Sequence, residues 1–218
     1  ALVPTVIIAH TVLGPIGWTI GQWVSEVVYA GLTGDFRWLF GLFFGTLYSP
    51  LVITGLHHMS NAIDLQLIAD FGGTNLWPMI ALSNIAQGSA VLAIIFLHRG
   101  NEKEEQVSIP AAISCYLGVT EPAMFGINIK YIYPFVAAMI GSGIAGLVAT
   151  TFNVMANSIG VGGIPGFLSI QTDSMAMFIV CMAIAIVVPF LLTVLFEKKQ
   201  LFAPKGEVED APVIQTQK

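Results

Sequence analysis

The sequence predicts an all-α integral membrane protein with about five transmembrane helices and additional re-entrant hairpin segments. Two observations predict this fold class. Charged residues make up 10% of the 218-residue chain and hydrophobic residues 56%, whereas a soluble domain carries about 25% charged residues. The hydrophobic residues also come in blocks of about 20, which is the length that a helix needs to cross a bilayer.

Five such blocks follow one another along the chain. The first extends from Ala1 to about Tyr29, with Glu26 as its only charge, and the other four are Phe36 to Leu56, Asn75 to His98, Tyr131 to Phe152 and Met175 to Phe196. The membrane part is therefore expected to occupy residues 1–200. Residues 201–218 are polar and contain two prolines, which predicts a disordered cytoplasmic tail.

Three segments between the blocks are too irregular to be ordinary spans: Gly55 to Gly73, Val107 to Ile129 and Asn153 to Asp173. The last is dense in glycine, and a lipid-facing helix could not satisfy all of its backbone amides. Irregular backbone at membrane depth lines cavities and marks transporter binding sites. We therefore expect re-entrant segments, with an exposed outer loop as the alternative for residues 153–173.

The basic residues predict the orientation. Lys198 and Lys199 directly follow the last block, so the positive-inside rule places the C-terminus in the cytoplasm. If the irregular segments dip into the membrane and return, all eight Lys and Arg residues, Arg37 included, are expected on that same side.

One carboxylate stands out in these apolar surroundings. Glu121 lies in the sequence GVTEPAMFG, between helix-breaking Gly118 and Pro122. A charge at membrane depth costs roughly 2.5 to 3.5 kcal/mol on insertion scales, so it indicates a functional site. The alternative is a structural carboxylate that accepts hydrogen bonds from backbone amides.

A histidine pair, His57 and His58, lies in the first irregular segment, in the sequence GLHHMSNAID. Adjacent helical residues point about 100° apart, so at most one of the two faces a given site. A histidine at the membrane interface with satisfied hydrogen bonds is the alternative, and no Cys, Glu or further His stands at the spacing of a zinc site.

The remaining composition excludes several classes. Cys115 and Cys181 stand in apolar sequence without CxxC spacing, which indicates buried thiols and neither a disulfide framework nor a metal site. The formal net charge of −5 argues against a nucleic-acid partner. We expect no bound metal and no cofactor.

Three motifs, GLHHMSNAID, GVTEPAMFGINIKY and NVMANSIGVGGIPGFLSIQ, occur in this order and spacing. They resemble the membrane-embedded C domain (EIIC) of sugar permeases of the bacterial phosphoenolpyruvate-dependent phosphotransferase system, glucose superfamily. Within it, they resemble the trehalose branch more than the sucrose and β-glucoside branches. The resemblance covers about Leu39 to Glu197.

The resemblance implies a ten-helix domain in the bacterial inner membrane, with both ends cytoplasmic, that works as a homodimer. This chain, which has no initiator Met, would be its second half. A cytoplasmic B domain (EIIB), expected upstream of Ala1, would donate the phosphoryl group from a phosphocysteine charged by upstream phosphocarriers. Nothing here matches that cysteine motif, so residues 1–218 alone are expected to be inactive.

The resemblance also assigns candidate sugar ligands. Glu121 matches the family's signature glutamate and His57 the first histidine of its GLH pattern, with His58 in reserve. Each of Glu121 and His57 is also a candidate general base that takes the proton of the sugar's 6-hydroxyl group. We favour Glu121.

Other polar residues complete the predicted site. Thr120 and Asn128 are expected to line it, and Lys130 either attracts the phosphoryl group or anchors the chain at the membrane surface. Weaker candidates are Asn61, Asp64 and Asp173.

The predicted function is import and phosphorylation of a disaccharide, trehalose to trehalose 6-phosphate. Sucrose and β-glucosides are the alternative substrates. A proton-coupled secondary sugar transporter would also use a buried Glu and His, and a non-transporting membrane scaffold would need neither residue for binding.

Overall fold

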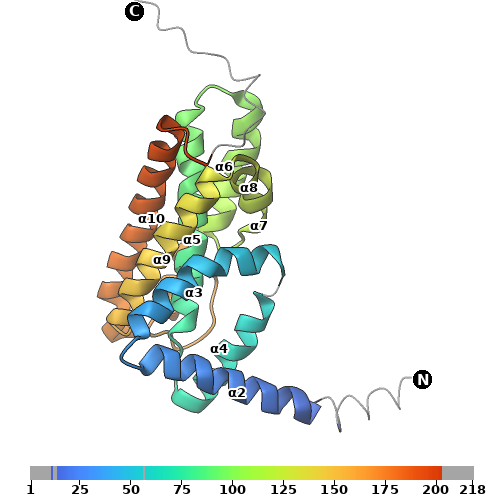
Figure 1. Ribbon diagram of the computed structural model, residues 1–218, viewed down its shortest axis with the longest axis vertical. Helices are drawn as coiled ribbons and strands as arrows, with labels where there is room; N and C mark the ends of the chain where they lie inside the picture. Colours follow the sequence, from blue (N-terminus) through green and yellow to red (C-terminus); the bar gives the residue numbers. More distant parts are fainter. Residues whose placement is uncertain (1–10, 12–13, 56, 203–218) are drawn as a thin grey trace, which may run out of the picture.

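The computed structural model describes residues 11, 14–55 and 57–202, and these form helices joined by turns (Figure 1). The only β pairing among them consists of isolated bridges, Thr74 with Ala156 and Ala156 with Ile170. The predicted all-α class is therefore confirmed. The predicted disordered tail lies outside the described residues from position 203 onward.

Three helices are long and apolar enough to cross a membrane: α5 (Leu76–Leu97), α9 (Tyr133–Thr151) and α10 (Met175–Lys198). They lie side by side along the long axis of the molecule (Figure 1). At 1.5 Å per residue, the 22 residues of α5 extend about 33 Å. Three of the five predicted spans are thus confirmed.

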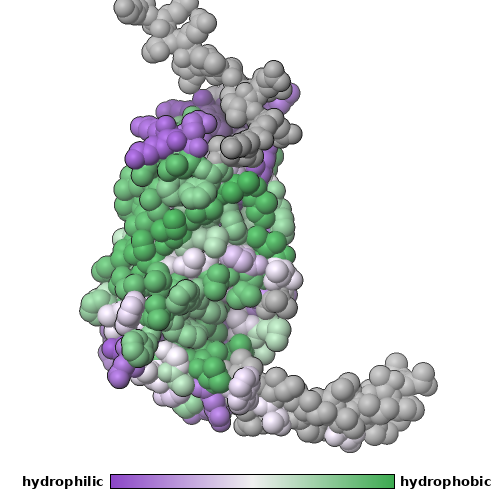
Figure 2. Space-filling view, in the orientation of Figure 1, coloured by the Kyte–Doolittle hydropathy of each residue, from purple (hydrophilic) through white to green (hydrophobic). Residues whose placement is uncertain are grey.

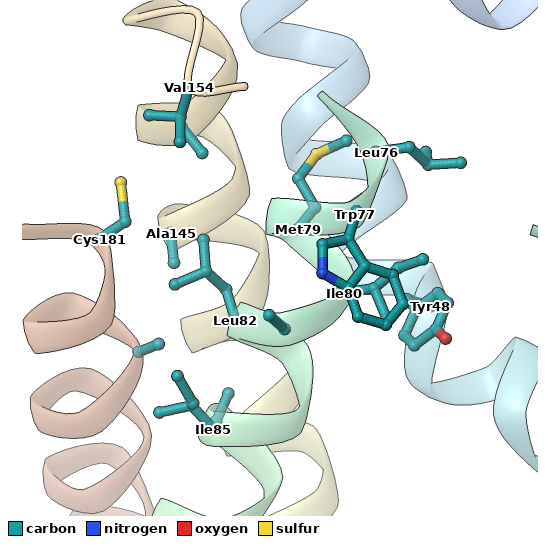
Figure 3. Close-up of a cluster of buried hydrophobic side chains, with 14 of the residues drawn as sticks. Tyr48, Leu76, Trp77, Met79, Ile80, Leu82, Ile85, Ala145, Val154 and Cys181 are labelled. Carbon is teal, nitrogen blue, oxygen red and sulfur yellow. The ribbon is translucent and has the colours of Figure 1, made fainter. Parts of the chain in front are cut away.

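The central helix is α5, and it is buried on nearly every side, because α3, α6, α9 and α10 all pack against it. Its apolar residues form one core with residues of α3, α9 and α10; Figure 3 shows Leu82 and Ile85 of α5, Ala145 of α9 and Cys181 of α10 in this core. The face seen in Figure 2 carries a largely apolar band between hydrophilic ends. This distribution fits a helix bundle embedded in a bilayer.

The predicted span from Phe36 to Leu56 does not cross the bundle. It forms α3 (Arg37–Ile53), which starts beside the end of α9 and stops about midway along α5. The chain then turns, and α4 (His58–Phe71) leads back to the start of α5. We call α3 and α4 the first hairpin, and we call the end of the bundle where α5 begins the Leu76 end.

The first hairpin lies on α9 through small residues four positions apart. Gly41 and Gly45 of α3 face Gly146 and Ser142 of α9, and an added Cβ on Gly45 would lie 2.6 Å from the carbonyl oxygen of Ser142. Small residues at this spacing allow helix backbones in a membrane to approach closely.

The first predicted span, from Ala1 to about Tyr29, lies partly outside the described residues. Residues from Gly14 onward belong to α2 (Gly14–Thr33), which lies crosswise at the Leu76 end (Figure 1). Its sequence contains Glu26 and several polar residues, and it is not among the helices apolar enough to span. Among the described residues, hydropathy alone thus predicts more full spans than the structure contains.

The second hairpin enters from the opposite end, which we call the Lys198 end because α10 finishes there. It consists of α6 (Glu102–Tyr116), α7 (Glu121–Ala123), the π-helix η2 (Met124–Asn128) and α8 (Ile129–Tyr131). Its base is closed by Glu104, which accepts one hydrogen bond from Tyr131 (2.6 Å) and pairs with His98 (2.8 Å). The predicted dip and return of Val107 to Ile129 is confirmed.

The glycine-rich segment, residues 152–174, follows α9 and includes the short 3₁₀ helices η3 (Ile164–Ser169) and η4 (Thr172–Ser174). It is joined to the start of α5, because Thr74 and Ala156 exchange backbone hydrogen bonds of 2.9 and 2.8 Å. Val154 and Ala156 are fully buried. Further along, Gly162 lies against Gly118 of the second hairpin. The segment therefore dips into the bundle and returns, and the alternative of an exposed loop is wrong.

The expectation that all basic residues share one side is also wrong for one residue. Arg37 starts α3 at the Leu76 end, whereas Arg99, Lys130 and Lys198 lie at the Lys198 end. The error follows directly from treating α3 as a complete span, which reversed the side assigned to its first residue.

Candidate functional site

The tips of the two hairpins meet halfway through the bundle. The tip of the first hairpin, near His57, follows α3, and Ser49 of α3 contacts Ser83 of α5. The tip of the second hairpin contains Gly118, which contacts Asn84 of α5. Asn84 stands eight residues into α5, about 12 Å from its start. The site is therefore at mid-depth between the two ends of the bundle.

The two strongest sequence candidates are brought together at these tips. The His57 Nε2 and Glu121 Oε1 atoms lie 3.9 Å apart. This separation is too long for a hydrogen bond, so both groups keep their capacity to bind a ligand. The side chains are 16% and 48% exposed, respectively, so the carboxylate is open to an incoming molecule.

His57 lies at the tip of the first hairpin, next to a second histidine. The two histidine rings lie 4.0 Å apart, centroid to centroid. A neutral imidazole offers one hydrogen-bond donor and one acceptor, which suits recognition of hydroxyl groups.

The turn that carries Glu121 is fixed by local backbone chemistry. Gly118 adopts φ +99°, a conformation that favours glycine. The amide of Val119 donates to the carbonyl oxygen of Ser114 at 2.9 Å, and the Ser114 hydroxyl donates to the carbonyl oxygen of Val119 at 3.0 Å. Pro122 then occupies the first turn of α7, where its missing N–H costs nothing.

The glycine-rich segment supports this turn from the Leu76 end. A Cβ added to Gly118 would lie 2.7 Å from the Cα of Gly162, so the two backbones are in direct contact. Asn84 stands beside both glycines and donates a hydrogen bond of 3.3 Å to the carbonyl oxygen of Gly118. Two of the three irregular segments predicted from sequence thus converge directly beneath Glu121.

The remaining predicted residues occupy different positions. His58 is exposed beside His57, and Thr120 is buried directly before Glu121. Asn128 is fully buried and donates to the side-chain oxygen of Gln87 at 2.6 Å. Lys130 lies at the base of the second hairpin, with its Nζ 5.1 Å from the Tyr131 ring centroid, so it is not brought to the His57–Glu121 pair.

The weaker candidates are not gathered at the tips. Asp64 is fully buried and accepts a 2.6 Å hydrogen bond from Thr74 at the start of α5, while Asn61 and Asp173 are exposed. Cys115 and Cys181 are free and buried, as predicted. Within the described part of the chain, no three His, Cys, Asp or Glu side chains are grouped so as to hold a metal ion.

Sequence reasoning missed Asn84 and Gln87. Both lie within the predicted span from Asn75 to His98, three residues apart, and both are buried. Polar residues within a membrane span usually face the protein interior, and that rule was a usable signal. The π-helix after Glu121, a feature common at functional sites, left no such signal in the sequence.

Fold and site together define an all-helical membrane domain with a polar site between re-entrant hairpins. A sequence model of the family described as "Phosphotransferase system, EIIC" matches residues 1–142. The chain belongs to this family.

Curated relatives agree with this assignment. The trehalose-specific EIIBC component of the phosphotransferase system (PTS) of Escherichia coli (strain K12) is 54% identical over 193 residues, covering 88% of this chain and 41% of the relative. The trehalose-specific EIIBC component of Bacillus subtilis (strain 168) is 49% identical over 180 residues, covering 82% and 38%.

The sucrose-specific EIIBC component of Pasteurella multocida (strain Pm70) is 44% identical over 209 residues, covering 91% of this chain and 42% of the relative. The chain thus spans about two fifths of the length of the relatives it matches. No solved structure matches the chain significantly.

Proposed function

We propose that this chain is the sugar-binding part of a PTS permease that imports a disaccharide, trehalose, and releases it as trehalose 6-phosphate. The observation that carries the proposal is the approach of His57 and Glu121 to 3.9 Å at mid-depth, between hairpins from opposite ends. The trehalose specificity named for two relatives supports the choice of sugar.

The pair suits the binding of sugar hydroxyls. A disaccharide loses hydrogen bonds to water when it enters the site, and each unreplaced bond costs about 1 to 3 kcal/mol. The carboxylate of Glu121 accepts from two neighbouring hydroxyls, while the imidazole of His57 donates to or accepts from a third. Because the two groups leave each other unpaired, neither must give up a partner when sugar binds.

The phosphoryl transfer is an in-line displacement. The oxygen of the sugar's 6-hydroxyl attacks the phosphorus of the EIIB phosphocysteine, the phosphorus–sulfur bond breaks, and the cysteine leaves as thiolate. The hydroxyl proton passes to a general base, for which we favour Glu121 over His57. Catalysis then rests on positioning and charge stabilisation, which the full-length protein with its EIIB domain must provide.

The proposed setting is a homodimer in the bacterial inner membrane, supplied by upstream phosphocarriers. We place the Lys198 end in the cytoplasm, because every described Lys and Arg except Arg37 lies there. Lys130 then stands on the side from which EIIB approaches. The isolated chain of residues 1–218 is expected neither to transport nor to phosphorylate sugar.

The test is sugar-dependent phosphorylation by the full-length protein in membrane vesicles, with trehalose, sucrose and a β-glucoside offered separately. Glu121→Gln should lower trehalose phosphorylation at least about 100-fold, the loss typical of a general base. His57→Ala should lower it about tenfold, the loss that corresponds to one hydrogen bond. Met59→Ala, at an exposed residue with no proposed role in the site, serves as the neighbouring control. Unmodified trehalose accumulated inside the vesicles would refute the proposal and favour a proton-coupled transporter instead.

Sucrose is the second candidate substrate, because a sucrose-specific relative also matches nearly the whole chain. Faster phosphorylation of sucrose than of trehalose at equal concentration would select it. The proposed roles of Glu121 and His57 are the same for both sugars.

A further inference from the structure

A row of four polar side chains crosses the centre of the bundle. We call this row, Ser83, Ser49, Gln87 and Asn128, the polar ladder. The Ser83 and Ser49 hydroxyls are 3.3 Å apart, Gln87 Nε2 donates to Ser49 Oγ at 2.7 Å, and Asn128 Nδ2 donates to Gln87 Oε1 at 2.6 Å. None of the four is more than 1% exposed.

The ladder joins elements that are far apart in sequence. Ser49 belongs to α3 of the first hairpin, eight residues before His57. Asn128 ends the π-helix of the second hairpin, seven residues after Glu121. Gln87 lies between them on α5, so a single side chain connects both hairpins to the central helix.

Gln87 has no equivalent elsewhere in the described part of the chain. The side chains of Asn84 and Ser89 on α5 also form hydrogen bonds to a hairpin, but their partners there, the Gly118 carbonyl oxygen and the Tyr116 hydroxyl, both belong to the second hairpin. Among the described residues, Gln87 alone has side-chain hydrogen bonds to both hairpins. Its donor and its acceptor are both used, and at this depth no lipid group could replace either partner.

We propose that Gln87 is a positioning residue that holds the two hairpin tips in register, so that His57 and Glu121 contact the same sugar. This inference rests on the proposed function and adds a residue that contacts no sugar itself. Asn128 accordingly acts through Gln87, and the sequence-based expectation that it lines the sugar site is replaced by this role.

The main test is Gln87→Met in the full-length protein, because methionine has nearly the same length and no nitrogen or oxygen to bond Ser49 and Asn128. The dissociation constant for the transported disaccharide should rise at least about tenfold, the ratio that corresponds to loss of one hydrogen bond. Gln87→Glu should restore most of the affinity, since a carboxyl group accepts from Asn128 and from the Ser49 hydroxyl.

The matched control is Thr193→Val on α10. Thr193 is also fully buried in the bundle, and its hydroxyl has no hydrogen-bond partner among the described residues. Its replacement should leave sugar affinity within twofold of the parent. If Gln87→Met does not accumulate in membranes, Ser49→Ala removes one contact of Gln87 with little change in volume and should weaken binding in the same direction.

A second readout does not depend on the sugar. Thr54 and Val119 are exposed, one near each tip, and spin labels on Thr54→Cys and Val119→Cys report the distance between the hairpins. A parent without these two cysteines corrects for labelling of native thiols. Gln87→Met should broaden the distance distribution, whereas Thr193→Val should leave it narrow.

The two readouts separate the possible failures. If none of the three sugars is phosphorylated by the parent, the proposed function fails, and the label distances still decide the role of Gln87. If Gln87→Met leaves the distance distribution unchanged, or leaves affinity for a phosphorylated sugar within twofold of the parent, the positioning role is overturned.

Discussion

The contact between Gly118 and Gly162 allows the effect of one methyl group to be estimated. In Gly118→Ala, the new Cβ would lie 2.7 Å from the Cα and 2.8 Å from the carbonyl carbon of Gly162. Backbone atoms cannot rotate away as a flexible side chain can. Crowding of this kind costs about 1 to 3 kcal/mol, and alanine at φ +99° adds about 1 to 2 kcal/mol.

Gly118→Ala should therefore lower the free energy of unfolding by about 2 to 5 kcal/mol. Because Gly118 begins the turn that ends at Glu121, the carboxylate should also shift away from His57. We expect sugar affinity to fall about tenfold or more, since small displacements of positioned groups have large effects. Denaturant unfolding of the purified full-length protein and equilibrium binding of trehalose measure the two effects.

Gly126→Ala is the control in the same hairpin. Its added Cβ would meet only Val107 Cγ1, at 3.4 Å, an ordinary contact. Alanine is also favoured over glycine in a helix by about 1 kcal/mol, so Gly126→Ala should keep or raise stability. Equal stability and sugar affinity of the two variants would refute the reasoning from the glycine contact.

Two further predictions concern the ends of the bundle and its thiols. Glu104→Gln should lower the free energy of unfolding by about 1.5 to 3 kcal/mol in the same denaturant assay, because it removes charge-assisted hydrogen bonds to His98 and Tyr131. Glu102→Gln, at an exposed residue, is the control. An equal effect of the two substitutions would show that Glu104 does not stabilise the base of the second hairpin. Cys115 and Cys181 are both fully buried and should resist a membrane-permeant maleimide until the protein is denatured in detergent. The exposed cysteine of Thr54→Cys should react at once. Rapid labelling of the two native thiols would show that the core is open.

The sequence predicted best where one physical rule acts alone. Block length and hydropathy identified α5, α9 and α10, since the bilayer sets a minimum length for a spanning helix. Glycine and proline content identified the re-entrant segments, because irregular backbone must be satisfied inside the protein. The free-energy cost of a charge at membrane depth indicated Glu121 as a site residue, and the structure places Glu121 beside His57.

The errors arose where apolar composition has two explanations. Residues 36–56 are as apolar as a span, but α3 is apolar because it packs on α9 and α5 within a hairpin. Hydropathy cannot distinguish these cases, and the side assigned to Arg37 was wrong for the same reason. Likewise, the spacing from Glu121 to Asn128 could not show that Asn128, at the end of the π-helix, forms a hydrogen bond with Gln87. That bond depends on how the second hairpin packs on α5.

The contact between α3 and α9 has a consequence for biosynthesis. Gly41 lies against Gly146, and the second residue is made 105 positions after the first. At about 5 to 20 residues per second, α3 waits roughly 5 to 20 s for the helix that receives it. During this interval the glycine face of the first hairpin lacks the helix that it packs on, so the hairpin reaches its final packing only after α9 has been made.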